Sequence, residues 1–372
     1  MTDAGKATSR STSRRPASAP SRPAPGAPAL GTGRLETVQL GSFSLESGAT
    51  LPALTVAYRH DGPGPEAAPQ ALVIHALTGS ADAAGDWWAP LIGPGRALDT
   101  RRVGVLCLNL LGGRYGSTGP TSVDPSTGAR YGAAFPDVTT RDQARAQWAL
   151  IDALGIDRLA LVTGGSLGGM VGLEVTLERP ERVAAVLPIA APAATGPLAL
   201  AWDRIQLELI ERLGEDGLAL ARQLAMTTYR SEADFDERFG RAAGPDGRPQ
   251  VVSYLDHQGR KLVERFDPDT YRILVGAMDS HDIGRGRGGA EAALTRLATA
   301  GTRLTGLGIA GDILYGPEQV RALVAAADAA GVESAYRELR SSKGHDAFLV
   351  EWPQLTGVIE EALRAALAAA AA

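Results

Sequence analysis

The chain has 372 residues, of which 44% are apolar and 21% are charged, so it holds enough material for one large domain or two ordinary ones. Its formal net charge of −5 comes without a basic stripe, which argues against nucleic acid as a partner. The single cysteine, Cys107, excludes a disulfide framework and a cysteine zinc site, and we expect it to be a small buried apolar side chain. No metal site is predicted. No apolar run reaches the roughly 18 residues of a membrane helix, and we expect a cytoplasmic protein without a membrane partner.

The beginning of the chain differs in composition from the rest. Residues 1–33 are rich in Ser, Pro, Ala and Gly, and their charges are mostly basic. Such a segment cannot bury enough apolar surface to offset the entropy lost on ordering. Organelle transit peptides have a similar composition, but no amphipathic pattern supports that interpretation. We therefore expect a disordered tail over 1–33 and one folded domain over 34–372.

After this segment, short apolar runs alternate with helical patterns. Near-continuous apolar strands that alternate with helices are typical of a mostly parallel sheet with helices on both faces, so the sequence predicts the α/β class. The expected strands lie at 71–77, 102–111, 158–164, 182–190, 304–312 and 334–339, and the expected helices at 139–155, about 170–178, 316–331 and from Leu355 onward.

The alternation stops between about 192 and 290. This region reads as mainly helical and charged, for example in the stretch "WDRIQLELIERLGEDGLALARQLAMTTY". A helical insertion inside an α/β sheet is commonly a lid that builds the substrate pocket. We therefore predict a helical lid over about 192–290.

Four glycines surround Ser166 in the stretch "TGGSLGGM". Residues 164–168 fit the pattern G-x-S-x-G between a predicted strand and a predicted helix, which lifts the serine hydroxyl above the edge of the sheet. A phosphate-binding loop is a weaker alternative, because neither G-K-[ST] nor G-x-G-x-x-G fits this loop. A simple packing turn is the other alternative. The pattern predicts that Ser166 is a nucleophile.

A serine nucleophile needs a base to take its proton and an acid to orient the base. With this type of elbow the chain order is Ser, then Asp or Glu, then His. His257 and His281 fall in the predicted lid, where we expect surface or packing roles, whereas His345 follows a predicted strand near the end of the sheet. Asp312 ends the strand before it, and its alternative role is a helix cap. The predicted triad is Ser166, Asp312 and His345.

Several stretches resemble one family, the homoserine O-acetyltransferases and their serine and succinyl relatives. They occur in the same order along nearly all of the chain after residue 33, which is far more specific than the triad pattern alone. They are "HALTG" (75–79), "WWAPLIGPGRALDT" (87–100), "NLLGGRYGSTGP" (109–120), "FPDVTTRDQARAQ" (135–147), "GGSLGGM" (164–170), "ARQLAMTTYRSEADFDERFGR" (221–241), "YLDHQGRKLVERFD" (254–267), "AMDSHDIGRGRG" (277–288) and "GHDAFLVE" (344–351).

The resemblance implies an α/β hydrolase fold and a ping-pong acyl transfer. Ser166 would attack the thioester of an acyl-CoA, His345 would take its proton, and Asp312 would orient His345. The negatively charged oxygen of the tetrahedral intermediate needs two preorganised N–H donors. In this family they correspond to the backbone amides of Leu77 and Leu167.

The resemblance also implies a site for an amino acid that carries a hydroxyl group. Arg222 matches the arginine of the family's lid and suits a bidentate grip on a carboxylate. Tyr229, two helical turns further on, lies on the same helix face. Asp346 matches the position that holds the ammonium group. The alternatives are a solvated helix charge for Arg222, lid packing for Tyr229 and a loop cap for Asp346. His75 in "HALTG" is expected to be a framework residue.

The activity implied by the resemblance is transfer of an acetyl group from acetyl-CoA, a co-substrate rather than a bound cofactor, to L-homoserine in methionine synthesis. The resemblance further implies a homodimer through the lid helices. Arg114, Leu167 and a shorter lid between Glu211 and Gly217 depart from the common family pattern. The alternatives are succinyl-CoA as donor, serine or another alcohol as acceptor, an esterase with the same triad, and a binding protein with an inactive triad.

Overall fold

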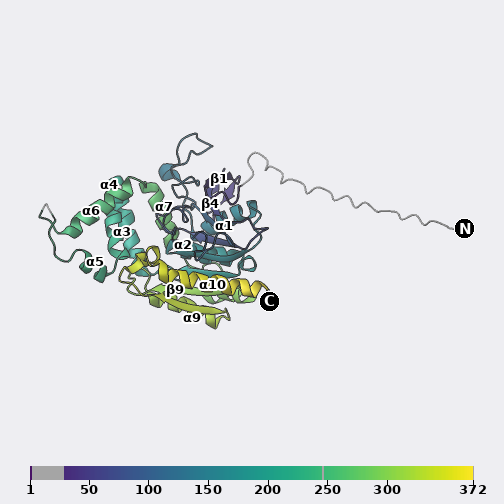
Figure 1. Cartoon of the computed structure of the whole chain (residues 1–372). Coiled ribbons are helices and arrows are strands. Elements are labelled where there is room, and N and C mark those ends of the chain that lie inside the picture. The colour runs from purple at the N-terminus through teal and green to yellow at the C-terminus, as the bar shows by residue number, and fades with distance from the viewer. Residues whose placement is uncertain (2–28, 245–246, 372) are drawn as a thin grey trace.

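An eight-stranded sheet forms the centre of the computed structural model, which describes residues 1, 29–244 and 247–371 (Figure 1). The strand order is β1–β4–β6–β5–β7–β8–β9–β10, and the strands from β6 to β10 are parallel while β1 and β4 are antiparallel to their neighbours. This arrangement confirms the predicted mostly parallel sheet. The strands are β1 Leu35–Gln39, β4 Thr55–Asp61, β5 Gln70–Ile74, β6 Gly104–Leu108, β7 Leu159–Gly165, β8 Ala185–Ile189, β9 Arg303–Ile309 and β10 Ser334–Leu339, with a separate hairpin of β2 Phe43–Ser44 and β3 Thr50–Leu51.

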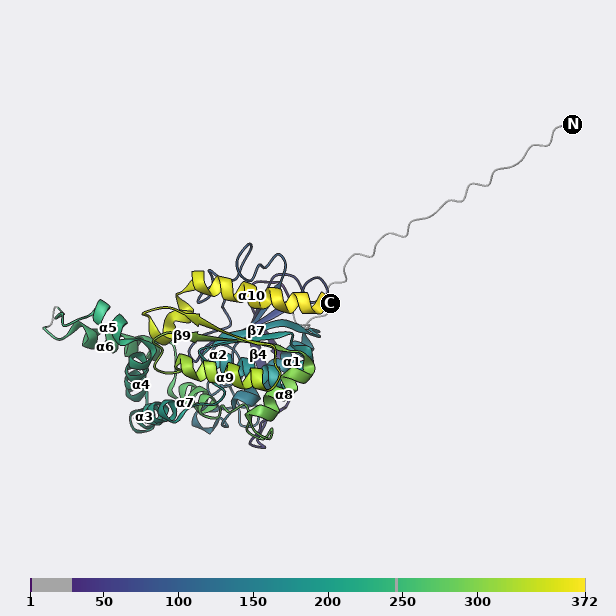
Figure 2. The ribbon, with the colours of Figure 1, turned by 90° about the horizontal axis from the view of Figure 1, so that it is seen from below.

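Helices cover both faces of this sheet (Figure 2). On one face lie α1, α2, α8 and α9, and on the other lies α10. Each face has its own cluster of buried apolar side chains: the second includes Leu355, Ile359 and Leu363 of α10 together with Trp88 and Leu91 of the loop after β5. The helices are α1 Thr140–Ala153, α2 Leu167–Glu178, α8 Ala290–Ala300, α9 Pro317–Ala329 and α10 Trp352–Ala371.

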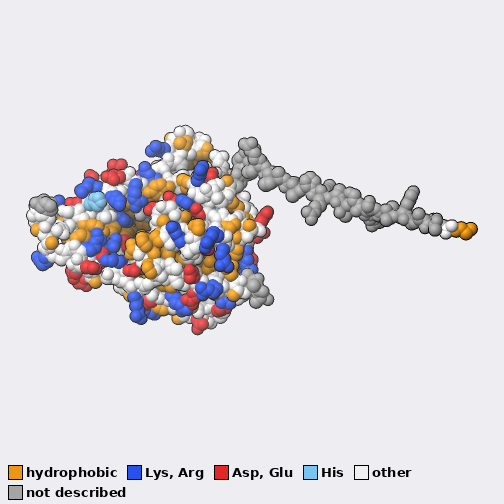
Figure 3. Space-filling model, viewed as in Figure 1, with side chains coloured by type: hydrophobic (Ala, Val, Ile, Leu, Met, Phe, Trp, Pro, Cys, Tyr) orange, Lys and Arg blue, Asp and Glu red, His pale blue; other side chains and the backbone are white. Residues whose placement is uncertain are grey.

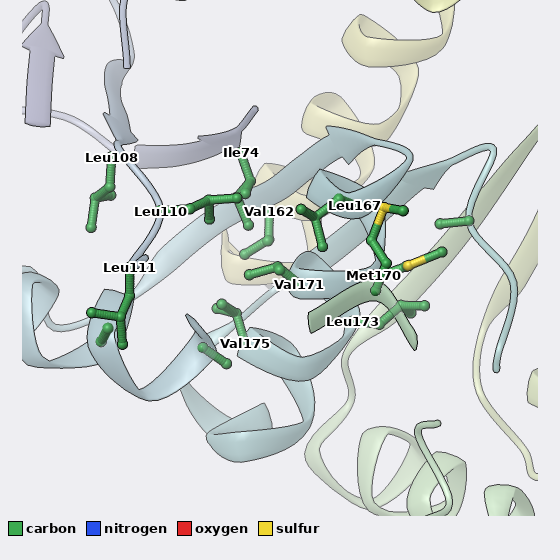
Figure 4. Packing of buried hydrophobic residues seen from close by; sticks show 14 of the residues in the cluster. Ile74, Leu108, Leu110, Leu111, Val162, Leu167, Met170, Val171, Leu173 and Val175 are labelled. Atoms are coloured by element: carbon green, nitrogen blue, oxygen red, sulfur yellow. The ribbon is translucent and has the colours of Figure 1, made fainter. Parts of the chain in front are cut away.

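Helix α2 is the most deeply buried of the helices that flank the sheet. Every one of its residues except Glu178 is buried, because its sequence "LGGMVGLEVTL" is apolar apart from Glu174 and Thr176. Figure 4 shows its apolar side chains lying next to Ile74 of β5 and Val162 of β7. Each fully buried Leu or Val contributes roughly 1.5–3 kcal/mol. The start of α2, where Ser166 lies, is therefore held firmly against the sheet.

The chain leaves the sheet after β8 to form a helical lid. In Figures 1 and 2 the helices α3 to α6 project from one end of the body, and the chain returns to the body with α8. The helices α3 to α7 lie within the region expected to form the lid, residues 192–290. Their bounds are α3 Pro197–Leu213, α4 Glu215–Tyr229, α5 Glu232–Arg238, α6 Gln250–Val263 and α7 Pro268–Asp279.

The structure adds elements that the apolar pattern did not predict. Strands β1 and β4 lie at the antiparallel edge of the sheet, where strands need no continuous apolar run, and β1 alternates exposed and half-buried residues. Helix α2 begins directly at Leu167 rather than near residue 170, because Gly168 and Gly169 hide the helical pattern of its first turn. No helix in the described ranges is both long and apolar enough to cross a membrane.

The segment before β1 contacts the body where the structure describes it. The Tyr58 hydroxyl donates a hydrogen bond to the carbonyl oxygen of Ala29 at 2.9 Å, and the Gly31 N–H donates to Nδ1 of His60 at 2.8 Å. Residues 29–33 of the predicted tail therefore make specific contacts. Residues 2–28 lie outside the described residues.

Candidate active site

Ser166 lies in the sharp turn between β7 and α2. Its backbone has φ 58° and ψ −127°, a conformation that a residue with a side chain rarely adopts and that costs of order 1–3 kcal/mol. Such strain persists only where the surroundings fix it. Here the Ser166 N–H donates to the carbonyl oxygen of Ile189 at 2.9 Å, and α2 starts at the next residue.

Glycines make this turn sterically feasible. A Cβ on Gly164 would lie 2.4 Å from the carbonyl oxygen of Ile74, and a Cβ on Gly168 only 2.2 Å from the same oxygen. A Cβ on Gly165 would lie 2.5 Å from the ring of Phe348. The glycines thus allow the turn to press against the end of β5 on one side and against the segment that carries His345 on the other.

Two backbone N–H groups beside this turn are candidates for an oxyanion site. Leu167 is the first residue of α2, and Leu77 follows β5 by three residues. Within the described part of the chain, neither N–H has a hydrogen-bond acceptor. The contact of Gly168 with the end of β5 brings the two segments together. Both N–H groups are therefore candidate donors to one negatively charged oxygen, to which the N-terminus of α2 would add a favourable dipole.

His75 supports the loop that carries Leu77. Its Nδ1 donates to the carbonyl oxygen of Ala76 at 2.7 Å, and its Nε2 accepts from the N–H of Leu110 at 3.1 Å, which assigns the proton to Nδ1. Burial lowers the pKa of His75 to about 4. Both ring nitrogens are engaged in hydrogen bonds, which fits the framework role expected for His75.

Asp312 and His345 form a buried pair. Asp312 follows β9, and His345 lies in the short 3-10 helix Gly344–Leu349 after β10. The His345 Nδ1 lies 2.6 Å from Oδ2 of Asp312. The other Asp312 oxygen accepts the N–H groups of Leu314 and Tyr315 at 2.9 and 3.1 Å. Asp312 is not the helix cap that was its alternative role, because the N-cap of α9 is Gly316.

The environment of His345 suits a base that becomes charged during a reaction. Burial favours the neutral ring, but the charge of Asp312 and its hydrogen bond outweigh this effect and raise the pKa of His345 above its usual value. The Nε2 atom is buried and has no hydrogen-bond partner among the described residues. Aromatic rings of Tyr229, Tyr315 and Phe348 surround the imidazole at 5.9, 5.5 and 5.6 Å.

The predicted catalytic residues thus meet at one edge of the sheet. Leu77, Ser166, Asp312 and His345 follow β5, β7, β9 and β10 respectively, and the carboxyl ends of parallel strands lie at the same edge. In open α/β sheets this edge is where ligands bind.

The lid brings its predicted residues to the same place. The guanidinium carbon of Arg222 lies 5.3 Å from the ring centroid of Tyr229, and the Tyr229 ring in turn contacts the ring of His345. Asp346 has a partner that the sequence did not indicate: its Oδ2 lies 3.3 Å from Nε of Arg230. Burial nevertheless raises the pKa of Asp346, against the opposing effect of Arg230 and Arg222.

The sequence did not predict a pair of carboxyl groups in the lid, one buried and one half-buried. Asp203 of α3 and Asp279 of α7 interact with each other, and burial together with this repulsion raises the pKa of Asp203. Gln206 donates to Asp203 at 2.9 Å, and the Tyr271 hydroxyl donates to Gln206 at 2.6 Å. One sequence signal was available: Asp203 and Gln206 lie on the buried face of α3 with Ala199 and Ile210.

A cavity of about 690 Å³ opens beside the Leu77 loop. Ala76 and Thr78, the neighbours of Leu77, line it together with Trp87, Arg222 and Leu349. Figure 3 shows the surface hollowed between the lid and the body, with basic side chains on the lid side of the hollow. The described residues contain no group of three or more side chains that could hold a metal ion. Cys107 is buried, which raises the pKa of its thiol and fits the expected packing role.

Known proteins resemble this chain in both sequence and structure. The sequence profile of the alpha/beta hydrolase fold matches residues 72–265. A homoserine O-acetyltransferase from Moorella thermoacetica is 42% identical over 350 residues, which cover 86% of this chain and 93% of that protein. The crystal structure of a homoserine O-acetyltransferase from Staphylococcus aureus has a TM-score of 0.74 at 32% identity, covering 88% of this chain and 94% of the other. The crystal structure of esterase E22 has a TM-score of 0.80 at 22% identity and covers 89% of this chain and 99% of the other. At this identity the likeness concerns the fold alone.

Proposed function

This chain belongs to the homoserine O-acetyltransferase family of the α/β hydrolase fold, and we propose that it transfers an acetyl group from acetyl-CoA to the hydroxyl of L-homoserine, a reaction of methionine biosynthesis. The observation that carries the proposal is the strained turn at Ser166. Beside it lie two backbone N–H groups, of Leu77 and Leu167, that have no hydrogen-bond acceptor among the described residues. The Asp312–His345 pair, with 2.6 Å between Oδ2 and Nδ1, lies at the same edge of the sheet. These groups supply a nucleophile, an oxyanion site and a base.

In the first half of the reaction, Ser166 would attack the thioester carbonyl carbon of acetyl-CoA. The hydroxyl proton passes to Nε2 of His345, and the negatively charged oxygen accepts the N–H groups of Leu77 and Leu167. The carbon–sulfur bond then breaks, and His345 returns the proton to the CoA sulfur. Acetyl-Ser166 and free CoA remain. Asp312 stabilises the charged imidazole while it holds the proton.

In the second half, the homoserine hydroxyl would attack acetyl-Ser166. His345 takes the hydroxyl proton and passes it to Oγ of Ser166 as the ester bond breaks, which releases O-acetylhomoserine and restores the enzyme. The side chains already named supply every proton transfer in these steps. The difference from an esterase lies in which hydroxyl reaches the acetyl-enzyme, that of homoserine or that of water.

The lid residues would select homoserine. We propose that Arg222 binds its carboxylate and that Tyr229 packs beside the substrate, with Asp346 attracting the ammonium group. Arg222 lacks a carboxylate partner within 4 Å in the described ranges, so its charge is available to a ligand. Arg230 neutralises part of the charge of Asp346, which makes Asp346 a weaker ammonium site than an unpaired acid.

Product analysis tests this function and its alternatives together. The purified protein is incubated with acetyl-CoA alone, with acetyl-CoA and L-homoserine, and with acetyl-CoA and L-serine; each arm is repeated with succinyl-CoA. We expect O-acetylhomoserine as the main product and slow release of free acetate without homoserine. Acetate release at the same rate in every acetyl-CoA arm would instead identify an esterase, and preference for succinyl-CoA or serine would identify another acyltransferase.

We also propose that the enzyme works in the cytoplasm. We further propose that it forms a homodimer through the lid helices. Its support is a set of exposed apolar side chains: Leu198, Ile205 and Leu213 on α3 and Leu220 on α4. Light scattering should show a dimer that I205E dissociates, whereas V123E, at an exposed apolar position of the body, should leave it intact. A wild-type monomer would contradict the proposal.

A further inference from the structure

Three cationic side chains of the lid region border the cavity beside the Leu77 loop. Arg222 lies on α4, Lys261 on α6, and Arg265 two residues beyond the end of α6. All three line the cavity, and with Gln258 they also line a smaller hollow next to it. Within the described part of the chain, none of the three has a carboxylate within 4 Å.

The opposite wall of the cavity differs in its charges. Arg59 lines it too, but Arg59 pairs with Asp61 at 2.8 Å and with Asp82. Asp86, an exposed carboxylate, lies on this wall near Trp87. Among the described residues that line the cavity, the cationic side chains without a carboxylate partner are therefore Arg222, Lys261 and Arg265, all on the lid side. Unpaired cations facing a cavity indicate a site for an anionic ligand.

The three cations differ in how firmly they are held. Arg265 donates to the carbonyl oxygen of Thr78 at 2.8 Å and to the Tyr115 hydroxyl at 3.0 Å, so its guanidinium is fixed against the loop that carries Leu77. Lys261 is exposed at the mouth of the cavity, whereas Arg222 is half-buried beside the Tyr229 ring. The exposure of the cationic side chains therefore decreases from Lys261 at the solvent to Arg222 near the predicted catalytic residues.

We infer that Lys261 and Arg265 bind the phosphate groups of the acyl-CoA donor, while Arg222 further in is left for the amino acid. The inference rests on the proposed function, since it assumes a CoA thioester as donor. A diphosphate carries two negative charges that Lys and Arg bind as charge-assisted hydrogen bonds. A cavity of about 690 Å³ is within the usual size of small-molecule sites. Phosphates held at its mouth direct the thioester arm inward past Thr78 to Leu77.

The test compares two donors that differ in their phosphates. Acetyl-CoA carries the diphosphate and the ribose phosphate, whereas S-acetylpantetheine carries the same thioester arm without any phosphate. The rate of Ser166 acetylation by each donor is measured in the wild type, in K261Q and in K261E. The control variant is R260Q, because Arg260 is the exposed neighbour on α6 that does not line the cavity.

We expect K261Q to lower kcat/KM for acetyl-CoA by about 5-fold and K261E by about 30-fold, with R260Q near wild type. The rate of acetylation by S-acetylpantetheine should stay within roughly 2-fold of the wild-type rate in every variant, because this donor has no phosphate group that Lys261 could contact. The salt dependence of the acetyl-CoA rate should also weaken in K261Q, which a purely structural role for Lys261 would not cause.

Several results would overturn the inference. Equal losses with both donors would mean that Lys261 maintains the fold, and equal effects of K261E and R260Q would mean a general charge effect. Adenosine 3′,5′-bisphosphate should protect Ser166 from acetyl-CoA; stronger protection by inorganic phosphate would identify a free phosphate site instead. Failure of the proposed function looks different, because then neither donor acetylates the wild type at Ser166.

Discussion

The body and the lid contribute to the site in different ways. In the body, Ser166 and Asp312 follow strands of one sheet, and contacts that only glycine permits fix the Ser166 turn. In the lid, Arg222 and Lys261 carry charges without carboxylate partners within the described residues, and Asp203 is buried against a second acid. We propose that the body residues carry out both half-reactions and that the lid residues select the substrates. Changes in the body should therefore affect every substrate, and changes in the lid only particular ones.

The largest effect is expected from Asp312 in the body. D312N should leave the fold intact and slow Ser166 acetylation by about 10⁴-fold with every donor, because the Asn amide favours the wrong tautomer of His345. Without the carboxylate that raises the pKa of His345, the acidic limb of the pH profile should also move to lower pH. Both quantities come from stopped-flow measurement of CoA release.

D346N is the matched control for this prediction. Asp346 is the next residue after His345 but is paired with Arg230 rather than with the imidazole. We expect D346N to raise KM for homoserine and to leave acetylation of Ser166 within a few-fold, roughly, of wild type. If D346N lost 10⁴-fold in acetylation while D312N did not, the two acids would have to exchange roles.

The next largest effect is expected from Arg222 in the lid. R222A removes a charge-assisted bidentate contact worth about 2–4 kcal/mol, which lowers kcat/KM for homoserine roughly 30- to 1000-fold. Acetylation of Ser166 by acetyl-CoA should hardly change, since that step does not involve the amino acid. The two half-reactions are measured separately, with R260A as the control. Equal losses in both would assign Arg222 to the donor or to the lid packing.

A smaller, pH-dependent effect is expected from the buried acids of the lid. Because folding raises the pKa of Asp203, the folded chain keeps a proton at a pH where the unfolded chain has lost it. Stability from this group therefore falls as pH rises from about 4 towards the folded pKa. D203N, which is neutral throughout, should be more stable than wild type by about 1–3 kcal/mol at pH 8 and lose this advantage near pH 4.

Thermal unfolding of both proteins across this pH range measures the difference. D216N serves as the control, because Asp216 is an exposed acid on α4 of the lid. A constant difference in stability between D203N and wild type at all pH values would show that Asp203 does not titrate as a buried acid in this range.

The smallest effect is expected at the beginning of the chain. Deleting residues 1–28 should change neither the melting temperature nor the activity beyond error, because this composition provides no apolar face. Deleting 1–33 should cost about 1–2 kcal/mol, since it also removes the partners of Tyr58 and His60. Two deletion variants with equal melting temperatures would show that these two hydrogen bonds contribute nothing.

The sequence predicts local features of this protein well and pairings between distant residues poorly. The glycines around Ser166, the parallel strands and the chain order of Ser, Asp and His each have a local or ordinal pattern. The Arg230–Asp346 contact and the Asp203–Asp279 pair join residues about 75 to 115 positions apart, and only tertiary packing brings them together. Strand β1 was not predicted because an edge strand lacks the apolar run that marks a buried strand, and β4 was not predicted because its sequence TVAYRHD mixes apolar and charged residues.

Ser166 is proposed to carry the acetyl group between the two substrates. Intact-protein mass spectrometry of the wild type after brief mixing with acetyl-CoA should show one added acetyl group, located on Ser166 by peptide mapping and removed by L-homoserine with formation of O-acetylhomoserine. S166A should show neither the added group nor turnover. An S166A variant that still transfers acetyl groups at near wild-type rate, or a wild-type acetyl group that homoserine does not remove, would rule out this role of Ser166.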